Sequence, residues 1–211
     1  MPVAVVFETH SISEDNEARV ATGWLGGRLS DAGREQAFLL GERRRRDGLD
    51  VVFTSDLNRA LETAQIAFGA GDLPVLLDWR LRECNYGRLN GMSRKRLDAE
   101  RSARLDEPFP DGESWQEAVQ RVALFLDELA DERDGQRVLV IGHVATRWAL
   151  DQRASGRPLN DFLSEPFEWQ EGWEYTLDRR VGWRDAGLGQ CSGMTPERRS
   201  SEPSLDRRRA P

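Results

Sequence analysis

The sequence predicts an α/β fold in three layers, with a mostly parallel central sheet covered by helices on both faces. Residues 3–7 and 138–141 are short apolar runs rich in β-branched residues, which is typical of strands buried on both faces. Segments with helical periodicity, roughly 10–20 residues long, separate such runs, and this length suits the crossover connections between parallel strands. A chain of 211 residues is long enough for one such domain.

The first half of the chain alternates between strand and helix. After the first strand, Ser30 is a typical N-cap residue, and the helix that it begins is expected to end near Gly48. A second strand is expected at Val51–Thr54. The next helix, over residues 56–68, has one apolar face, and a short third strand follows it at residues 74–77.

The second half contains a long amphipathic helix and two more strands. The helix is expected to begin at a capping box formed by Ser114 and Glu117. Its apolar face consists of Val119, Val122, Phe125, Leu126 and Leu129. The strand at residues 137–141 precedes a helix over residues 145–154, and a last strand is expected within residues 169–177.

Composition limits the organisation and the partners of the chain. Residues 1–178 are expected to form one domain, whereas residues 179–211 hold eight arginines against four acids and few large apolar residues, which predicts a disordered tail. The net charge of −7 argues against nucleic acid and anionic membranes as partners. No secretory signal or long apolar run is present, and Cys84 and Cys191 form no metal or disulfide spacing, so a cytoplasmic location is expected.

Three of the expected strands end in residues that can bind an anion. His10 follows the first strand, Arg59 lies on the first turn of the helix after the second strand, and His143 follows the strand at residues 137–141. These two are the chain's only histidines. Ligands of open parallel sheets bind beyond the carboxyl ends of the strands. An arginine fork, two imidazoles and the free N–H groups of helix starts together favour phosphate as the bound group.

The same residues indicate a chemistry. A neutral imidazole is a competent nucleophile towards phosphorus, and Glu83 is a candidate acid for the leaving oxygen, although the residues alone do not distinguish it from a solvated carboxylate. A metal site would need a third ligand such as Asp15 or Asp151, and the spacing does not favour one, so neither metal nor cofactor is expected. The chain also lacks the G-x-S-x-G elbow of serine hydrolases and the Gly-rich loops of nucleotide sites.

Six blocks of sequence occur in an order and spacing that match one known family. They are Val5-Val6-Phe7-Glu8-Thr9-His10 with Asn16; Thr22-Gly23-Trp24 with Leu29-Ser30-x-x-Gly33; Phe53-Thr54-Ser55-Asp56-Leu57-x-Arg59-Ala60-x-x-Thr63-Ala64; Leu81-Arg82-Glu83-x-x-Tyr86-Gly87-x-x-Asn90-Gly91; Pro110-x-Gly112-Glu113-Ser114; and Val138-Leu139-Val140-Ile141-Gly142-His143. Across residues 3–177 the chain thereby resembles the histidine phosphatase superfamily, also described as phosphoglycerate mutase-like.

The resemblance implies a phosphoglycerate mutase-like fold and a catalytic domain over residues 1–178. It also implies a phosphatase that hydrolyses small phosphomonoesters without a cofactor. His10 would attack the phosphoryl group, and Glu83 would protonate the leaving oxygen and later activate water. Arg59 and His143 would stabilise the charge on the phosphoryl oxygens, with Asn16 as an additional donor. The substrate-binding residues that it implies are Asn16, Thr22, Gly23 and Arg59.

The chain departs from the family at the nucleophile, where Thr9-His10-Ser11 replaces the usual Arg-His-Gly. A threonine hydroxyl is neither charged nor forked, so the loss of the arginine is expected to cost about two to three decades in rate. Low activity, a different phosphorylated substrate and a catalytically silent phospho-ligand binder all stay open. The arginines considered as replacements are Arg19, Arg28, Arg82 and Arg147.

A phosphoglycerate mutase is the alternative enzyme. Mutases of the family carry a longer insertion after the acid-bearing block, whereas residues 91–108 are short here, so a phosphatase is preferred. The basic residues of this segment are expected to form a solvated helix face. They are Arg94, Lys95, Arg96, Arg101 and Arg104. Trp148 and Trp169 are expected in the core, whereas Trp24 and Trp115 are candidates for substrate contact.

Overall fold

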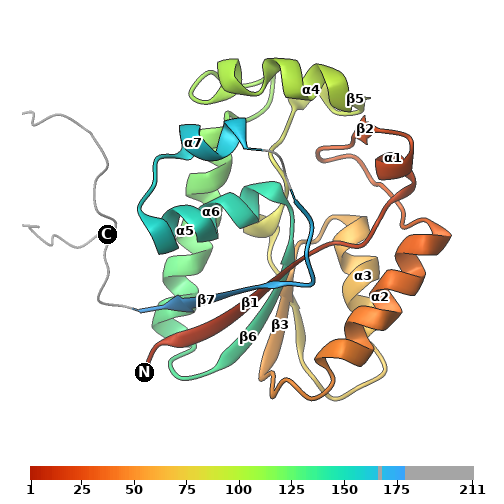
Figure 1. Ribbon diagram of the computed structural model, residues 1–211, viewed down its shortest axis with the longest axis vertical. Coiled ribbons are helices and arrows are strands. Elements are labelled where there is room, and N and C mark those ends of the chain that lie inside the picture. The colour runs from red at the N-terminus through yellow and green to blue at the C-terminus, as the bar shows by residue number, and fades with distance from the viewer. Residues whose placement is uncertain (166–167, 179–211) are drawn as a thin grey trace, which may run out of the picture.

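The computed structural model describes residues 1–165 and 168–178, and it confirms the predicted α/β fold (Figure 1). Its central sheet has five strands in the order β4-β3-β6-β1-β7. The strands β1 (Val3–Thr9), β6 (Arg137–Gly142), β3 (Val51–Thr54) and β4 (Val75–Leu77) are parallel. At one edge β7 (Trp173–Leu177) runs antiparallel to β1. The expected tail over residues 179–211 lies outside the described residues.

Helices cover both faces of the sheet (Figure 1). The helices α2 (Asp31–Arg44) and α3 (Asn58–Phe68) share a buried apolar cluster with Val6, whereas α5 (Trp115–Glu132) and α6 (Val144–Ser155) share the larger cluster with Val5 and Phe7. This division follows from the strand itself, because successive side chains of a strand point to opposite faces. Within the described residues, no helix combines the length and apolarity needed to cross a bilayer.

The helix boundaries are set by local caps. The Ser30 hydroxyl accepts a hydrogen bond from the first turn of α2, and Ser114 and Glu117 form both bonds of the capping box at the start of α5, so both predicted starts are confirmed. The end of α2 is several residues earlier than predicted. Gly48, with a φ of 64°, lies in the turn before β3 instead of capping the helix.

Several short elements gather beyond the carboxyl ends of the central strands (Figure 1). They are α1 (Glu14–Glu17), β2 (Val20–Ala21), β5 (Met92–Ser93), α4 (Arg94–Glu100) and α7 (Leu159–Ser164), with single 3₁₀ turns at Trp79–Leu81, Gly87–Leu89 and Ser102–Arg104. β2 and β5 pair as a separate two-stranded sheet. Most of these elements are too short to show a hydrophobic period, so local patterns in the sequence do not predict them.

The tryptophans correct two predictions. Trp148 is 7% exposed, which confirms a core position, but Trp169 is 57% exposed in the irregular segment before β7, so its predicted core position is wrong. Trp115 is 1% exposed and packs edge-on against Trp148 with ring centroids 4.8 Å apart. Trp115 is therefore a core residue, and its side chain is not available for contact with a substrate.

Candidate active site

The parallel register of β1 and β6 brings the two histidines together. Thr9, the last residue of β1, lies beside Gly142, the last residue of β6, and a histidine directly follows each strand. The backbone N–H of His10 also donates to the carbonyl of Gly142, at 3.0 Å. The rings of His10 and His143 have their centroids 5.0 Å apart. The positions of both residues at the carboxyl ends of parallel strands predict a common site, and the pairing of β1 with β6 brings them into contact.

Arg59 connects the two imidazoles. It lies on the first turn of α3 and is 3% exposed. Its Nε donates to Nε2 of His10 at 3.3 Å, and one Nη2 hydrogen points to Nδ1 of His143, also at 3.3 Å. Nη2 donates as well to the carbonyl of Gly23, at 3.0 Å. Among the residues described, Arg59 has no ion pair with a carboxylate.

The burial of Arg59 has an electrostatic consequence. Loss of solvation lowers the pKa of Arg59, and the negative charge of Glu83 acts against this shift. The guanidinium is nevertheless a cation, because arginine does not lose its proton in proteins. A buried cation whose nearest partners are neutral favours an anion beside it.

His10 is held in the form needed for nucleophilic attack through Nε2. Its Nδ1 lies 2.7 Å from the carbonyl oxygen of Ser11, and because a carbonyl can only accept, Nδ1 carries the proton. The lone pair is then on Nε2, the atom that faces Arg59. Burial, and next the charge of Arg59, lower the pKa of His10 from its usual 6.5 to about 3. The imidazole is therefore neutral at physiological pH.

His143 presents a hydrogen-bond donor without a partner. Its Nδ1 faces an arginine N–H, which can only donate, so the proton of the neutral ring is on Nε2. That Nε2 is buried and has no hydrogen-bond partner within the described structure. Burial, and next the charge of Arg59, hold the pKa of His143 well below its usual value. An oxygen of a bound phosphoryl group would satisfy this donor.

Glu83 lies at the start of α6, next to His143. Its Oε1 accepts from the backbone N–H groups of Cys84, at 2.9 Å, and Ala145, at 3.3 Å, while Oε2 accepts from that of Val144, at 3.4 Å. The carboxyl group is buried at 9% exposure. Glu83 is therefore not a solvated carboxylate, because its side chain is fixed by the first backbone N–H groups of α6, which directly follow His143.

The backbone of this acid is held by residues that were not predicted in such a role. Trp24 donates its indole N–H to the carbonyl of Glu83, at 2.6 Å, instead of extending towards a substrate. Arg121 of α5 donates to the same carbonyl, at 3.1 Å, and pairs with Glu113. A buried arginine on an amphipathic helix breaks the apolar pattern, and this irregularity was the signal in the sequence.

The predicted substrate-binding residues differ in how close they are to Arg59. Gly23 contacts Arg59 through its carbonyl. Thr22 is buried and donates its hydroxyl to Asp15, at 2.8 Å. Asn16 uses its Oδ1 to accept from Ser13 and so closes the capping box of α1. The roles of Asn16 and Thr22 in binding substrate stay predictions, because their hydrogen bonds here are internal to the loop.

None of the four candidate arginines replaces the missing one in the described structure. Arg82 forms a forked ion pair with Asp56, with distances of 2.6 and 2.5 Å. Arg147 pairs with Asp151 at 2.6 Å. Arg19 and Arg28 are exposed. Arg59 is thus the arginine that contacts the two imidazoles. In the described residues, no other guanidinium takes the place of the arginine that Thr9 replaces.

No cluster of three or more potential metal ligands occurs among residues 1–165 and 168–178. The third ligands considered from the sequence, Asp15 and Asp151, are instead bound to Thr22 and to Arg147 respectively. Arg59 presents N–H groups to both imidazoles, and such donors suit an anion.

Two curated proteins are similar to this chain over most of its length. The chain is 35% identical over 209 residues to phosphoglycerate mutase-like protein 4 of Arabidopsis thaliana, covering 88% of this chain and 91% of that protein. It is 30% identical over 214 residues to the 2,3-bisphosphoglycerate-dependent phosphoglycerate mutase of Neisseria meningitidis serogroup A, covering 82% of this chain and 94% of the mutase.

A solved mycobacterial glucosyl-3-phosphoglycerate phosphatase has the same fold, with a TM-score of 0.67 and 23% identity over 78% of this chain and 84% of that one. The family model of the histidine phosphatase superfamily, branch 1, matches residues 8–172. That span begins before the first histidine and includes every segment that meets at Arg59. The chain is therefore a member of the histidine phosphatase superfamily.

Proposed function

We propose that this protein hydrolyses small phosphomonoesters through a phosphohistidine formed on His10. The observation that carries the proposal is the buried guanidinium of Arg59, which lies between two neutral imidazoles without a carboxylate partner in the described structure. A phosphoryl group would supply the missing negative charge and accept from Arg59 and from Nε2–H of His143.

The first step is a transfer of the phosphoryl group to His10. The lone pair on Nε2 forms the N–P bond while the bond from phosphorus to the leaving oxygen breaks. That oxygen takes a proton from the carboxylic acid form of Glu83, and the alcohol departs. Arg59 and His143 stabilise the charge on the phosphoryl oxygens during the transfer, because their donors are already oriented before the substrate binds.

The second step returns the enzyme to its starting state. Water gives a proton to the Glu83 carboxylate and attacks phosphorus, and the N–P bond breaks. Inorganic phosphate leaves, and Nε2 of His10 regains its lone pair. The carbonyl of Ser11 keeps the proton of His10 on Nδ1 throughout, so the imidazole has the same tautomer in both steps.

A phosphoglycerate mutase is the second candidate, favoured by the names of the two relatives. The phosphoryl group on His10 would then pass to a second hydroxyl of a bound phosphoglycerate and not to water. The replacement of the family arginine by Thr9 favours a third outcome, a protein that binds phosphorylated ligands without turnover.

The test is detection of the covalent intermediate. The protein is mixed with p-nitrophenyl phosphate or a panel of sugar phosphates, and its intact mass is measured with and without an acid quench. The unquenched protein should carry one phosphoryl group, and the acid-quenched protein should have lost it. His10→Ala should show none, and phosphate release should fall to the background rate. Glu83→Gln should still bind substrate while kcat falls by about two to four decades.

The three candidates give different results. Release of inorganic phosphate that depends on His10 supports the phosphatase. Transfer between positions of phosphoglycerate without net release supports the mutase and contradicts the phosphatase. Binding of a phosphorylated ligand with no turnover and no labelled His10 supports the silent binder.

A further inference from the structure

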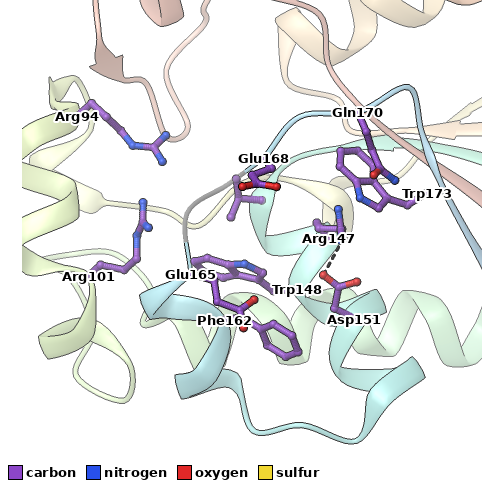
Figure 2. Close-up of a pocket in the computed structure, with 11 residues that line it drawn as sticks. Arg94, Arg101, Arg147, Trp148, Asp151, Phe162, Glu165, Glu168, Gln170 and Trp173 are labelled. Carbon is purple, nitrogen blue, oxygen red and sulfur yellow. Dashed lines mark hydrogen bonds and ion pairs between the residues drawn. The ribbon is translucent and has the colours of Figure 1, made fainter.

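A cavity of about 370 Å³ opens beside the start of α6, with Arg94 and Arg101 on one side of it (Figure 2). Lys95 and Arg96 are exposed instead. The expectation that the basic residues over 91–108 form one solvated helix face is therefore wrong for Arg94 and Arg101, because α4 turns one side towards α6 (Figure 1). The described residues that line this cavity do not include the segment around the nucleophile.

A smaller cavity, of about 80 Å³, lies beside the nucleophile itself. His10, Ser11, Gln36 and Trp169 are among the residues that line it. A polar space of this size has room for water, and water next to Ser11 can compete for the hydrogen bonds that orient His10. The orientation of the imidazole therefore depends on how firmly the backbone after it is held.

Two side chains from different helices hold the peptide groups on either side of Ser11. The backbone N–H of Ser11 donates to Oγ1 of Thr63, on α3, at 3.0 Å. The backbone N–H of Ile12 donates to Oε1 of Gln36, on α2, at 3.2 Å. Because peptide groups are planar and each residue has only two soft dihedrals, holding both groups fixes φ and ψ of Ser11.

The bond from Gln36 sets the direction of the Ser11 carbonyl. The N–H of Ile12 and the C=O of Ser11 belong to one trans peptide group, so they point in opposite directions. While the N–H points to Gln36, the carbonyl oxygen lies 2.7 Å from Nδ1 of His10. This contact keeps the proton of the ring on Nδ1 and the lone pair on Nε2.

The Thr63 hydroxyl uses its donor and its acceptor on two parts of the site. Thr63 is 0% exposed, and its hydroxyl donates to the carbonyl of Arg59, one turn earlier in α3, at 2.7 Å. The single proton of the hydroxyl is thus engaged, and the oxygen is left to accept from Ser11. The bond joins the helix that carries Arg59 to the backbone that follows His10. Without it, a buried N–H would lose its acceptor.

We propose that Thr63 and Gln36 are positioning residues for the nucleophile. Through the two peptide groups of Ser11 they fix the tautomer and the orientation of His10. This inference rests on the proposed phosphatase function and deepens it. In the free protein Arg59 also favours the lone pair on Nε2, but in the proposed reaction its donors bind the phosphoryl oxygens. The Ser11 carbonyl is then the contact that keeps Nδ1 protonated during the attack.

Kinetics with p-nitrophenyl phosphate separate positioning from binding. Thr63→Val removes the hydroxyl at nearly constant volume, and Gln36→Met leaves the Ile12 N–H to water, which does not fix its direction. In both variants kcat should fall about ten- to a hundredfold while KM stays within about threefold, because the donors of Arg59 and His143 remain. Thr63→Ser keeps the hydroxyl and should retain kcat within about threefold.

A proton NMR spectrum tests the same arrangement without turnover. It is recorded with saturating inorganic phosphate, which engages Arg59. The hydrogen-bonded Nδ1–H of His10 should give a downfield, slowly exchanging resonance that is identified by its absence in His10→Ala. Thr63→Val and Gln36→Met should lose this resonance through exchange with water, whereas Thr63→Ser should keep it.

Matched controls come from neighbouring positions. Gln65 lies on α3 and is exposed, and Thr54 of β3 is buried, with a hydroxyl that donates to the carbonyl of Ser55 at 3.3 Å. Gln65→Met and Thr54→Val should leave both kcat and the resonance unchanged. Because Gln36 is only partly buried, Gln36→Met should keep the fold even if Thr63→Val does not.

Survival of the resonance in both folded variants would overturn the proposal, whether or not any ester is turned over, and survival in one of them would remove that residue from it. A fall in kcat with an unchanged resonance would also overturn it, because Thr63 and Gln36 would then only support the fold. Failure of the proposed phosphatase function gives a different result. The wild type would then show neither turnover nor phosphohistidine, and the resonance would still decide whether these residues hold His10.

Discussion

At the scale of single residues, one guanidinium connects the two histidines of the candidate site. Arg59 donates to His10 through Nε and points Nη2 at His143, so a single side chain positions both rings. Thr9 stands where the family has a second arginine, and none of the described candidate arginines takes over its contacts. We expect a slower phosphoryl transfer than in relatives with two guanidinium groups, because charge-assisted donors at the transition state are worth decades in rate.

The low pKa of His10 predicts an acid-sensitive stability. The pKa of His10 is about 6.5 in the unfolded chain and about 3 in the folded protein. At pH values between these two, the unfolded chain binds a proton at this imidazole and the folded protein does not. The contribution of the neutral His10 to stability is therefore complete above pH 6.5. The free energy of unfolding falls as the pH decreases from 6.5 towards about 3. In His10→Gln, which cannot titrate, the decline should be shallower.

Urea denaturation of the wild type and of His10→Gln at about pH 7 and about pH 4 measures this difference. Carboxylates titrate in both proteins, so only the difference between the two declines reports on position 10. Equal declines would show that His10 is accessible to solvent protons in the folded protein.

At the scale of elements, the loop between β2 and α2 is fitted to the site through one glycine. Gly23 has a φ of 56°, and a Cβ atom there would lie 1.9 Å from Oδ1 of Asn90. That oxygen accepts from the N–H groups of Trp24 and Tyr86. The loop contains the Gly23 carbonyl, which accepts from Arg59, and its contacts with Asn90 connect it to the segment that follows Glu83.

Gly23→Ala should lower kcat/KM at least about tenfold, because the left-handed backbone and the clash with Asn90 would displace the carbonyl that Arg59 contacts. Steady-state kinetics with p-nitrophenyl phosphate provide the measurement. Gly26→Ala is the control from the same loop, since a Cβ atom there meets nothing within 4 Å and its backbone is not in the left-handed region. Similar activity in both variants would contradict this role for Gly23.

At the scale of the whole molecule, the site exists only when the sheet is assembled. His10, Arg59, Glu83 and His143 come from four separate segments, and the order β3-β6-β1 places the ends of their strands side by side. The neutral histidines and the buried Arg59 leave an anion site that the unfolded chain lacks. A ligand of this site should therefore stabilise the folded protein.

Inorganic phosphate at about 100 times its Kd should raise the free energy of unfolding by about 2.7 kcal/mol, which corresponds to a rise in Tm of about 5–10 °C. Differential scanning fluorimetry measures the shift. It should vanish in Arg59→Gln and persist in Arg34→Gln, whose guanidinium forms only partly exposed ion pairs with Asp31 and Glu62. An equal shift in all three proteins would indicate a general salt effect on the folded state.

The parts of the fold that depend on neighbours in sequence were predictable. Buried strands show as apolar runs, and the caps at Ser30 and Ser114 involve residues three positions apart, so the order of strands and helices could be read directly. The short elements β2, β5 and α1 were missed because two to four residues show no period. Trp169 was placed in the core from its residue type alone, which does not say what packs against it.

For the site, the sequence by itself determined which residues come at the ends of the central strands, because the position and length of each strand along the chain follow from local patterns. Only the tertiary structure decided that Arg59 bonds to both imidazoles, that His143 keeps an unpaired donor, and that Arg101 turns towards a cavity. Burial, charge balance and hydrogen-bond partners arise between segments that are far apart in the chain. They are properties of the assembled molecule, and no window of sequence contains them.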